Sequence, residues 1–130
     1  MNAPANLKYT KSDEWVKLDG NMATVGITDY AQEQLSDVVF VEITVDVDDQ
    51  VKKQAHIATI ESVKAAADVN SPVSGKVIEI NQNLANAPEK VNTEPFGAAW
   101  MLKIEISNPA EMSELMDAKA YEEHCSARSH

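Results

Sequence analysis

The chain has 130 residues, of which 44% are hydrophobic and 25% are charged, and this is the size and composition of one globular domain with a single core. Its 21 acidic and 11 basic residues give a formal net charge of −10, a sign that repels phosphate backbones. No apolar run approaches the ~18 residues of a membrane span, and residues 1–6 lack the basic and apolar regions of a leader. We therefore expect a cytoplasmic protein that binds neither nucleic acid nor membranes.

Most of the predicted elements are short strands separated by turn residues. These segments, apolar or alternating in pattern, lie at 14–18, 22–27, 38–44, 51–54, 56–62, 66–70, 73–80 and 100–107. Asp19-Gly20-Asn21 joins the first two as a hairpin, because glycine accepts a positive φ at no steric cost. Short strands in close succession favour a sandwich or a barrel over a parallel sheet.

One short helix is predicted in the first third of the chain. Either Thr28 or Asp29 is placed to cap it, and it continues to Leu35. Asp29 and Gln32 also stand at the spacing of a capping box. We therefore expect a helix of about two turns that separates the first hairpin from the strands that follow.

The remaining helices are predicted in the second half of the chain. A short helix is expected over 83–92, and another after Asn108, which would be its N-cap with Glu111 at the third position. A final helical turn or two begins near Asp117. Cys125 follows in a polar tail, and a single cysteine is compatible with a reducing compartment.

A single lysine is the most informative residue of the sequence. Lys64 lies in the run Glu61-Ser62-Val63-Lys64-Ala65-Ala66-Ala67-Asp68, between strand-like segments at 56–60 and 75–80, so its amine is predicted to stand on an exposed turn. A convex tip has no pocket walls that would depress the pKa of an amine or orient a substrate, and a Schiff-base lysine needs such burial. What the tip does allow is attachment of a long flexible group by another enzyme.

Six segments of the chain, taken in order, resemble one known family. The segments are 7–16, 24–32, 37–42, 61–75, 95–100 and 117–122. Together they resemble the H protein of the glycine cleavage system, a relative of the biotinyl/lipoyl domains, over about residues 7–123. The resemblance implies a mainly β fold, a flattened hybrid barrel-sandwich of two antiparallel sheets with short peripheral helices and a C-terminal helix. Residues 7–124 would form one lipoyl-type domain, with flexible ends at 1–6 and 125–130.

The same resemblance implies a carrier without catalysis of its own. Lys64 would bear lipoate in amide linkage, attached by a lipoate ligase or an octanoyltransferase. Glu61, three residues before the lysine, is either a charge that this enzyme recognises or a solvated carboxylate at the end of a strand. The arm would take an aminomethyl group from glycine decarboxylase to aminomethyltransferase, and electrons to dihydrolipoyl dehydrogenase. Ser12, Glu14 and Asp68 match polar positions that would hold the loaded arm against the body. The carrier is expected to be a monomer.

Several positions depart from the family pattern. Asp48, Gln54 and Ala58 stand where the family usually has glycine, and Ser36 follows the first helix where glycine would be the easy stop. Aspartate tolerates a left-handed turn conformation, whereas glutamine does so at a cost of about 1 kcal/mol over glycine. These departures bear on local turn geometry and leave the carrier role in place.

The sequence leaves other functions open. A biotin carrier is disfavoured, because Val63 and Ala65 flank the lysine where biotin domains typically have methionine. A lipoyl relay that hands lipoate to other enzymes and an unmodified β-rich interaction domain both remain alternatives. An enzyme with its own active site is the least supported interpretation, since the sequence shows no clear Ser/His/Asp set, phosphate-binding loop or metal-ligand spacing.

Overall fold

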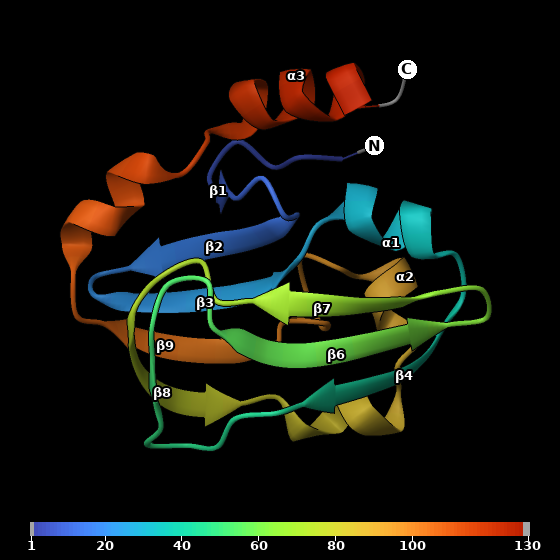
Figure 1. Ribbon diagram of the computed structural model, residues 1–130, viewed down its shortest axis with the longest axis horizontal. Coiled ribbons are helices and arrows are strands. Elements are labelled where there is room, and N and C mark those ends of the chain that lie inside the picture. The colour runs from blue at the N-terminus through green and yellow to red at the C-terminus, as the bar shows by residue number, and fades with distance from the viewer. Residues whose placement is uncertain (1, 129–130) are drawn as a thin grey trace.

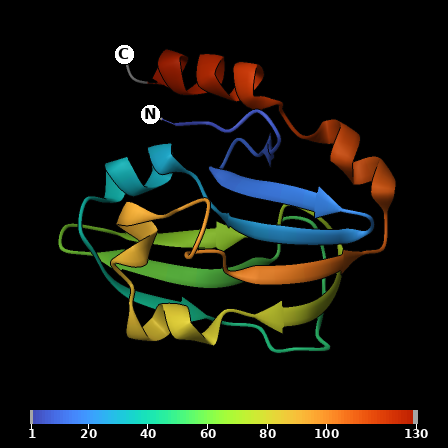
Figure 2. The ribbon, with the colours of Figure 1, turned by 180° about the vertical axis from the view of Figure 1, so that it is seen from behind.

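The computed structural model describes residues 2–128, which form two antiparallel sheets flanked by short helices (Figures 1 and 2). The six-stranded sheet has the order β1 (Lys8–Tyr9), β2 (Glu14–Asp19), β3 (Met22–Ile27), β9 (Leu102–Ile106), β8 (Gly75–Ile80) and β5 (Gln50–Val51). The three-stranded sheet has the order β4 (Val38–Ile43), β6 (His56–Ser62) and β7 (Ala66–Asn70). The helices are α1 (Asp29–Leu35), η1 (Gln82–Asn86), α2 (Lys90–Thr93), η2 (Pro109–Glu114) and α3 (Ala118–Arg128), the two η elements being 3-10 helices.

This architecture confirms the predicted mainly β fold with two antiparallel sheets, short helices and a C-terminal helix. Its main core lies between the sheets. It consists of the side chains that point inward, which alternate along each strand with side chains that point outward. Val25 and Ile104 come from the larger sheet and Ile57 and Ile60 from the smaller one, and all four are fully buried. Burial of each such side chain stabilises the fold by about 1.5–3 kcal/mol. Within residues 2–128, none of the helices combines the length and the apolar character that a membrane span needs.

A second cluster of buried residues lies beneath α3. Its members are Leu7, Tyr9, Trp15, Tyr121 and Cys125, and the rings of Tyr9 and Tyr121 stack with centroids 4.7 Å apart. The expected polar tail from Cys125 onward is wrong for residues 125–128, because α3 continues to Arg128 and Cys125 is only 2% exposed. The spacing of four residues between Tyr121 and Cys125 places both on the helix face that packs inward. Residues 1, 129 and 130 lie outside the described part of the chain.

The N-terminal segment lies against this cluster. The Asn2 amide donates to Asp29 at 2.7 Å, and the Pro4 carbonyl accepts a hydrogen bond from the Tyr9 hydroxyl at 2.6 Å. These contacts connect the segment to both α1 and β1. The flexibility expected for residues 1–6 stays a prediction.

The first helix follows the sequence prediction closely. Thr28 is the N-cap of α1, and its hydroxyl accepts a hydrogen bond from the Ala31 amide at 3.2 Å. The Gln32 side chain donates to Asp29 at 2.8 Å, so the two residues at capping-box spacing do interact. The residue after the helix, Ser36, has a positive φ of 64°.

The predicted helix over 83–92 is instead two short helices, η1 and α2. Pro88 lies between them, and proline both lacks an amide donor and disfavours a helical conformation in the residue before it. Ala87 accordingly leaves the helical region, with φ −142° and ψ 60°. The helix expected after Asn108 is the 3-10 helix η2, and the Asn108 side chain makes no capping bond.

Glu111 does not complete a capping box, because it binds a different part of the chain. Its carboxylate accepts hydrogen bonds from the Ser74 amide at 2.7 Å and from the Ser74 hydroxyl at 2.8 Å. These charge-assisted bonds connect η2 to the turn before β8 and compete successfully with a local cap. The final helix α3 is also longer than expected, with 11 residues in place of a turn or two.

Most of the residues that stand where the family usually has glycine have a left-handed backbone conformation. Asp48 and Gln54 both have a φ of 77°, as the missing glycines suggest. The strand predicted over 51–54 therefore stops early, at Val51, and Gln54 belongs to the turn before β6. Ala58 differs from these residues, because it lies buried in β6 beside a register shift and has no positive φ.

Candidate functional site

Lys64 lies in the loop between β6 and β7, which pair as a hairpin. The tip of this hairpin is at the right-hand end of Figure 1. Ser62 and Ala65 close the hairpin, because the Ser62 amide donates to the Ala65 carbonyl at 2.8 Å. Val63 and Lys64 are the two residues of the loop, and both are exposed. The lysine therefore stands on the protruding turn that the sequence predicts, although its partner strand is the nearer β7 and not residues 75–80.

The Ser62 hydroxyl holds the loop in shape. Its oxygen accepts hydrogen bonds from the Lys64 amide at 3.3 Å and the Ala65 amide at 3.1 Å, and its proton is donated to the Ala65 carbonyl at 3.2 Å. The Val63 amide donates to the Asp37 carbonyl at 3.0 Å and so ties the loop to the segment before β4. The backbone beneath the lysine is fixed, while its side chain extends into solvent.

A cleft of about 290 Å³ begins beside this tip. Its lining residues are Ser12, Asp13, Glu14, Ile27, Ala31, Gln34, Leu35, Ile60, Ala65, Ala67, Asp68 and Val69. One wall comes from β7, the second from the turn before β2, and the third from α1. Because Ala65 is also a hairpin residue next to the lysine, the cleft is adjacent to the point where an attached arm would start.

Glu14 contributes a buried carboxylate to the cleft. It is only 1% exposed; its Oε1 accepts hydrogen bonds from the hydroxyls of Thr10 and Ser12, each at 2.6 Å, and its Oε2 accepts one from the Asn70 amide at 3.2 Å. Burial raises the pKa of Glu14 above its ordinary value, although these hydrogen bonds act to lower it. A positively charged group that entered the cleft would favour the ionised carboxylate and would bind to it.

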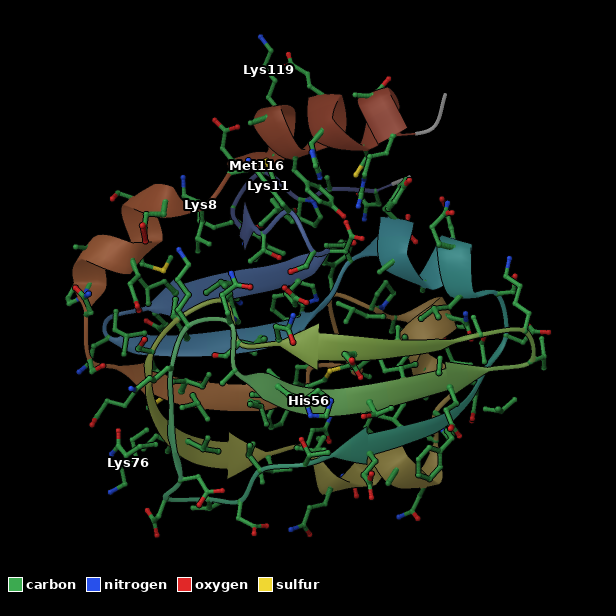
Figure 3. The ribbon with its side chains drawn as sticks, viewed as in Figure 1. Lys8, Lys11, His56, Lys76, Met116 and Lys119 are labelled. Atoms are coloured by element: carbon green, nitrogen blue, oxygen red, sulfur yellow. The ribbon has the colours of Figure 1, made fainter. Side chains whose placement is uncertain are left out.

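Asp68 lies on β7 and is one of three acidic residues that line the cleft, with Asp13 and Glu14; it differs from Glu14 in exposure. Its side chain is 75% exposed and lies 3.4 Å from Nε2 of His56, which is labelled on β6 in Figure 3. An exposed pair of this kind contributes little to stability. The cleft therefore combines the buried carboxylate of Glu14 and the solvated carboxylate of Asp68 with Asp13, whose carboxylate pairs with Arg128, among apolar and hydroxyl groups.

The structure thus brings together three of the five residues that the family resemblance singles out. Ser12, Glu14 and Asp68 line the same cleft. Lys64 stands next to it on the hairpin tip, whereas Glu61 is exposed on β6 and does not line the cleft. No group of three or more His, Cys, Asp or Glu side chains within residues 2–128 is arranged to hold a metal ion.

Sequence reasoning missed two contributions to this site. Thr10 and the Asn70 amide both donate to Glu14, yet they are separated by 60 residues of chain and share no motif. The wall formed by Ala31 and Leu35 of α1 was also missed, because only the cap and the end of the helix were predicted and no role was assigned to its faces. A buried glutamate with polar residues at positions two and four before it was the one local signal of a carboxylate network.

Comparison with known proteins identifies this arrangement. The solved structure of a glycine cleavage system H protein from Mycobacterium marinum superposes with a TM-score of 0.83, at 28% sequence identity and over 98% of this chain and 99% of that one. The two-sheet fold with its C-terminal helix is therefore the fold of such a carrier subunit. Among curated proteins, the glycine cleavage system H proteins of Symbiobacterium thermophilum and Thermotoga maritima are 49% and 52% identical. The matches cover 93% and 91% of this chain, and 94% of each relative.

The family model described as glycine cleavage H-protein matches residues 7–128. The chain belongs to the glycine cleavage H-protein family, which confirms the resemblance inferred from its six segments. Membership of this family supports a carrier role in glycine cleavage.

Proposed function

We propose that this chain is the lipoyl carrier of a glycine cleavage system, with lipoate in amide linkage to Lys64. Family membership supports the proposal, and the observation that carries it is the place of Lys64, exposed on a two-residue loop whose backbone is fixed by Ser62. A modifying enzyme can reach such an amine from outside. The bound group would supply a cyclic disulfide that opens to two thiols, which is the chemistry needed to carry an aminomethyl group and two electrons.

The cleft beside the tip fits the proposed arm. Ile27, Leu35, Ile60 and Ala67 offer apolar surface to an aliphatic chain. Deeper in the same cleft, Glu14 would bind the ammonium group of the cargo, with Ser12 and Asp68 as the other polar positions. A docked cargo would be shielded from water, and its premature loss would be slowed.

The proposed partners act in sequence on the arm. Glycine decarboxylase would load the aminomethyl group, aminomethyltransferase would unload it, and dihydrolipoyl dehydrogenase would reoxidise the thiols. A lipoate ligase or an octanoyltransferase would attach the arm, and the exposed carboxylate of Glu61, three residues before the lysine, is available for its recognition. The net charge of −10 would speed encounter with basic surfaces on these partners.

The carrier would contribute no catalysis itself, because Lys64 has no pocket walls around it. We also propose that it is a monomer and that it works in the cytoplasm. The chain has a single cysteine, Cys125, which is in keeping with a reducing compartment.

Intact-mass measurement tests the attachment. Protein produced in a lipoate-competent host should carry one lipoyl or octanoyl increment, and Lys64→Arg should carry none. Lys17→Arg, which changes another exposed lysine in β2, is the matched control and should keep the increment. An unmodified wild-type chain, or an increment that survives Lys64→Arg, would overturn the proposal.

A second measurement tests the docking of the arm. With the arm loaded and the transferase absent, Glu14→Ala should release the cargo faster than the wild type. Glu61→Ala removes the same charge outside the cleft and should leave the release rate unchanged. Equal release from the wild type and Glu14→Ala would show that the cleft does not hold the cargo.

A further inference from the structure

The C-terminal helix lies on the far side of the turn that supplies Glu14. In Figures 1 and 2, α3 lies above β1 and the N-terminal segment, whereas the hairpin tip with Lys64 lies at another end of the molecule. Reciprocal hydrogen bonds between the backbones of Tyr9 and Met116, each 2.8 Å, hold the start of α3 against β1. Figure 3 shows Met116 below α3, in the segment that precedes the helix, and Lys119 on the helix itself, projecting away from the sheets. None of the cleft-lining residues belongs to α3.

One side chain of α3, that of Tyr121, nevertheless contacts two of the three walls of the cleft, although it does not line the cleft itself. The Tyr121 hydroxyl is buried, donates to Oδ1 of Asp13 at 2.8 Å, and lies 2.6 Å from Oγ1 of Thr28. Since the single phenol proton goes to Asp13, the Thr28 hydroxyl must donate its own proton to the Tyr121 oxygen. The hydroxyl thus forms one bond to the turn before β2 and one to the residue that begins α1.

The first of these bonds holds a turn with a left-handed backbone conformation. Asp13 has a φ of 74°, which aspartate tolerates better than most non-glycine residues. Its carboxylate also accepts two hydrogen bonds from the Arg128 guanidinium, one to each oxygen. Asp13 stands directly between Ser12 and Glu14 in the chain, so the position of its backbone determines where those two cleft residues point.

The second bond holds the helix on the opposite wall. Thr28 accepts the Ala31 amide as the N-cap of α1, and its own amide donates to the Asp13 carbonyl at 3.0 Å. Ala31 and Leu35 of α1 line the cleft. Because the cap fixes the first turn of the helix, movement of Thr28 would displace that wall.

We infer that Tyr121 is a positioning residue for the cleft, whose hydroxyl sets the distance between the turn that presents Glu14 and the helix that forms the opposite wall. The inference rests on the proposed docking of the loaded arm and assigns a role in it to the C-terminal helix. The hydroxyl touches neither the arm nor its cargo. Removal of it would widen the range of positions that the two walls adopt and would weaken docking.

Tyr9 provides a matched control. Its hydroxyl is also buried and also makes one short bond, to the Pro4 carbonyl at 2.6 Å, and its ring stacks on that of Tyr121. The Pro4 carbonyl does not belong to a wall of the cleft. Tyr9→Phe and Tyr121→Phe therefore remove the same group from the same cluster, and only the second change disconnects the cleft.

The first test uses the unmodified protein, so that it does not depend on the arm. Amide hydrogen exchange is measured by NMR for Thr28 and Ala31, with the amides of β3 as the internal reference for overall stability. In Tyr121→Phe both amides should exchange at least about threefold faster relative to β3, because the change removes the hydrogen bonds to both Asp13 and Thr28. In Tyr9→Phe their ratio to β3 should stay at the wild-type value. A ratio that is unchanged in Tyr121→Phe, or equally raised in both variants, would overturn the inference.

The second test measures release of the loaded cargo in the absence of the transferase. If release occurs from the undocked arm, Tyr121→Phe should raise its rate about threefold to tenfold, and Tyr9→Phe should not change it. Glu14→Ala distinguishes a failure of the proposed docking from a failure of the role assigned to Tyr121. No acceleration in Glu14→Ala would refute the docking itself, whereas acceleration in Glu14→Ala with equal rates in the two tyrosine variants would refute only the role of Tyr121.

Discussion

Gln54 occupies a turn position for which glycine is better suited, and its replacement should stabilise the protein. The Ala55 amide donates to the Lys52 carbonyl at 2.9 Å, and the φ of Gln54 is 77°, as at the third position of a type II turn. The Gln54 amide donates to the Ser71 carbonyl at 2.7 Å, a bond that glycine would keep. The exposed side chain makes little contribution that glycine would forfeit.

The magnitude follows from two opposing contributions. Relief of the left-handed conformation contributes about 1–2 kcal/mol, and the greater freedom of glycine in the unfolded chain costs about 0.5–1 kcal/mol. Gln54→Gly should therefore raise the free energy of unfolding by about 1 kcal/mol, which for a domain of this size corresponds to a Tm higher by about 3–4 °C. Urea unfolding should show a higher midpoint with an unchanged m-value.

Two variants control for this interpretation. Gln54→Ala removes the side chain and keeps the left-handed strain, so its free energy of unfolding should stay within about 0.5 kcal/mol of the wild type. Asp48→Gly should gain less than Gln54→Gly, because aspartate tolerates this conformation and its exposed pair with Lys76, at 3.4 Å, would be lost. The reasoning would be refuted if Gln54→Gly were no more stable than Gln54→Ala.

Three further predictions concern the cleft, the core and the tip. Burial raises the pKa of Glu14, so the folded protein holds this proton more tightly than the unfolded chain does. As pH rises from about 4 to about 7, the wild type should lose stability relative to Glu14→Gln in urea unfolding. A Cβ on Gly75 would overlap the Glu105 carbonyl oxygen, so Gly75→Ala should lower the free energy of unfolding by about 3 kcal/mol. A Cβ on Gly97 would meet only the Glu94 side chain, at 3.9 Å or more, which is ordinary contact, so Gly97→Ala should change it by less than about 0.5 kcal/mol. Ser62→Ala removes the side-chain bonds of the lysine loop and should lower kcat/KM for lipoylation about threefold.

Each of these has an outcome that contradicts it. Parallel pH profiles for the wild type and Glu14→Gln would mean that the carboxyl group titrates alike in folded and unfolded chains. Equal unfolding midpoints for Gly75→Ala and Gly97→Ala would show that β8 and β9 separate easily at that position. Unchanged lipoylation of Ser62→Ala would show that the loop keeps its shape through the backbone alone.

The lysine tip and most strands could be predicted because their causes are local. Residues on either side of Lys64 have strand patterns, and a two-residue loop closed by neighbouring residues depends on nothing distant. The departures from glycine at Asp48 and Gln54 likewise pointed to turns, and both residues have a positive φ. Backbone conformation over four or five residues is within the range of local propensity and spacing.

Local patterns failed where a distant partner competed with the local one. Glu111 had the spacing of a capping box, but it binds Ser74, which lies 37 residues earlier. Cys125 has polar neighbours in the sequence and was assigned to a tail, yet it is buried because Tyr121 and the N-terminal segment cover that face. In both cases the outcome depends on which surface the packed sheets present to the segment.

The sequence by itself determined the strand pattern, the family and the lysine at the exposed tip. Only the tertiary structure decided how the cleft is built, because its parts come from separate strands and helices. Glu14 meets the Asn70 amide across 56 residues of chain, and Thr28 meets Tyr121 across 93. Such pairs have no periodicity or spacing of their own, since they form only when the packing of the two sheets and of α3 fixes the distances between them.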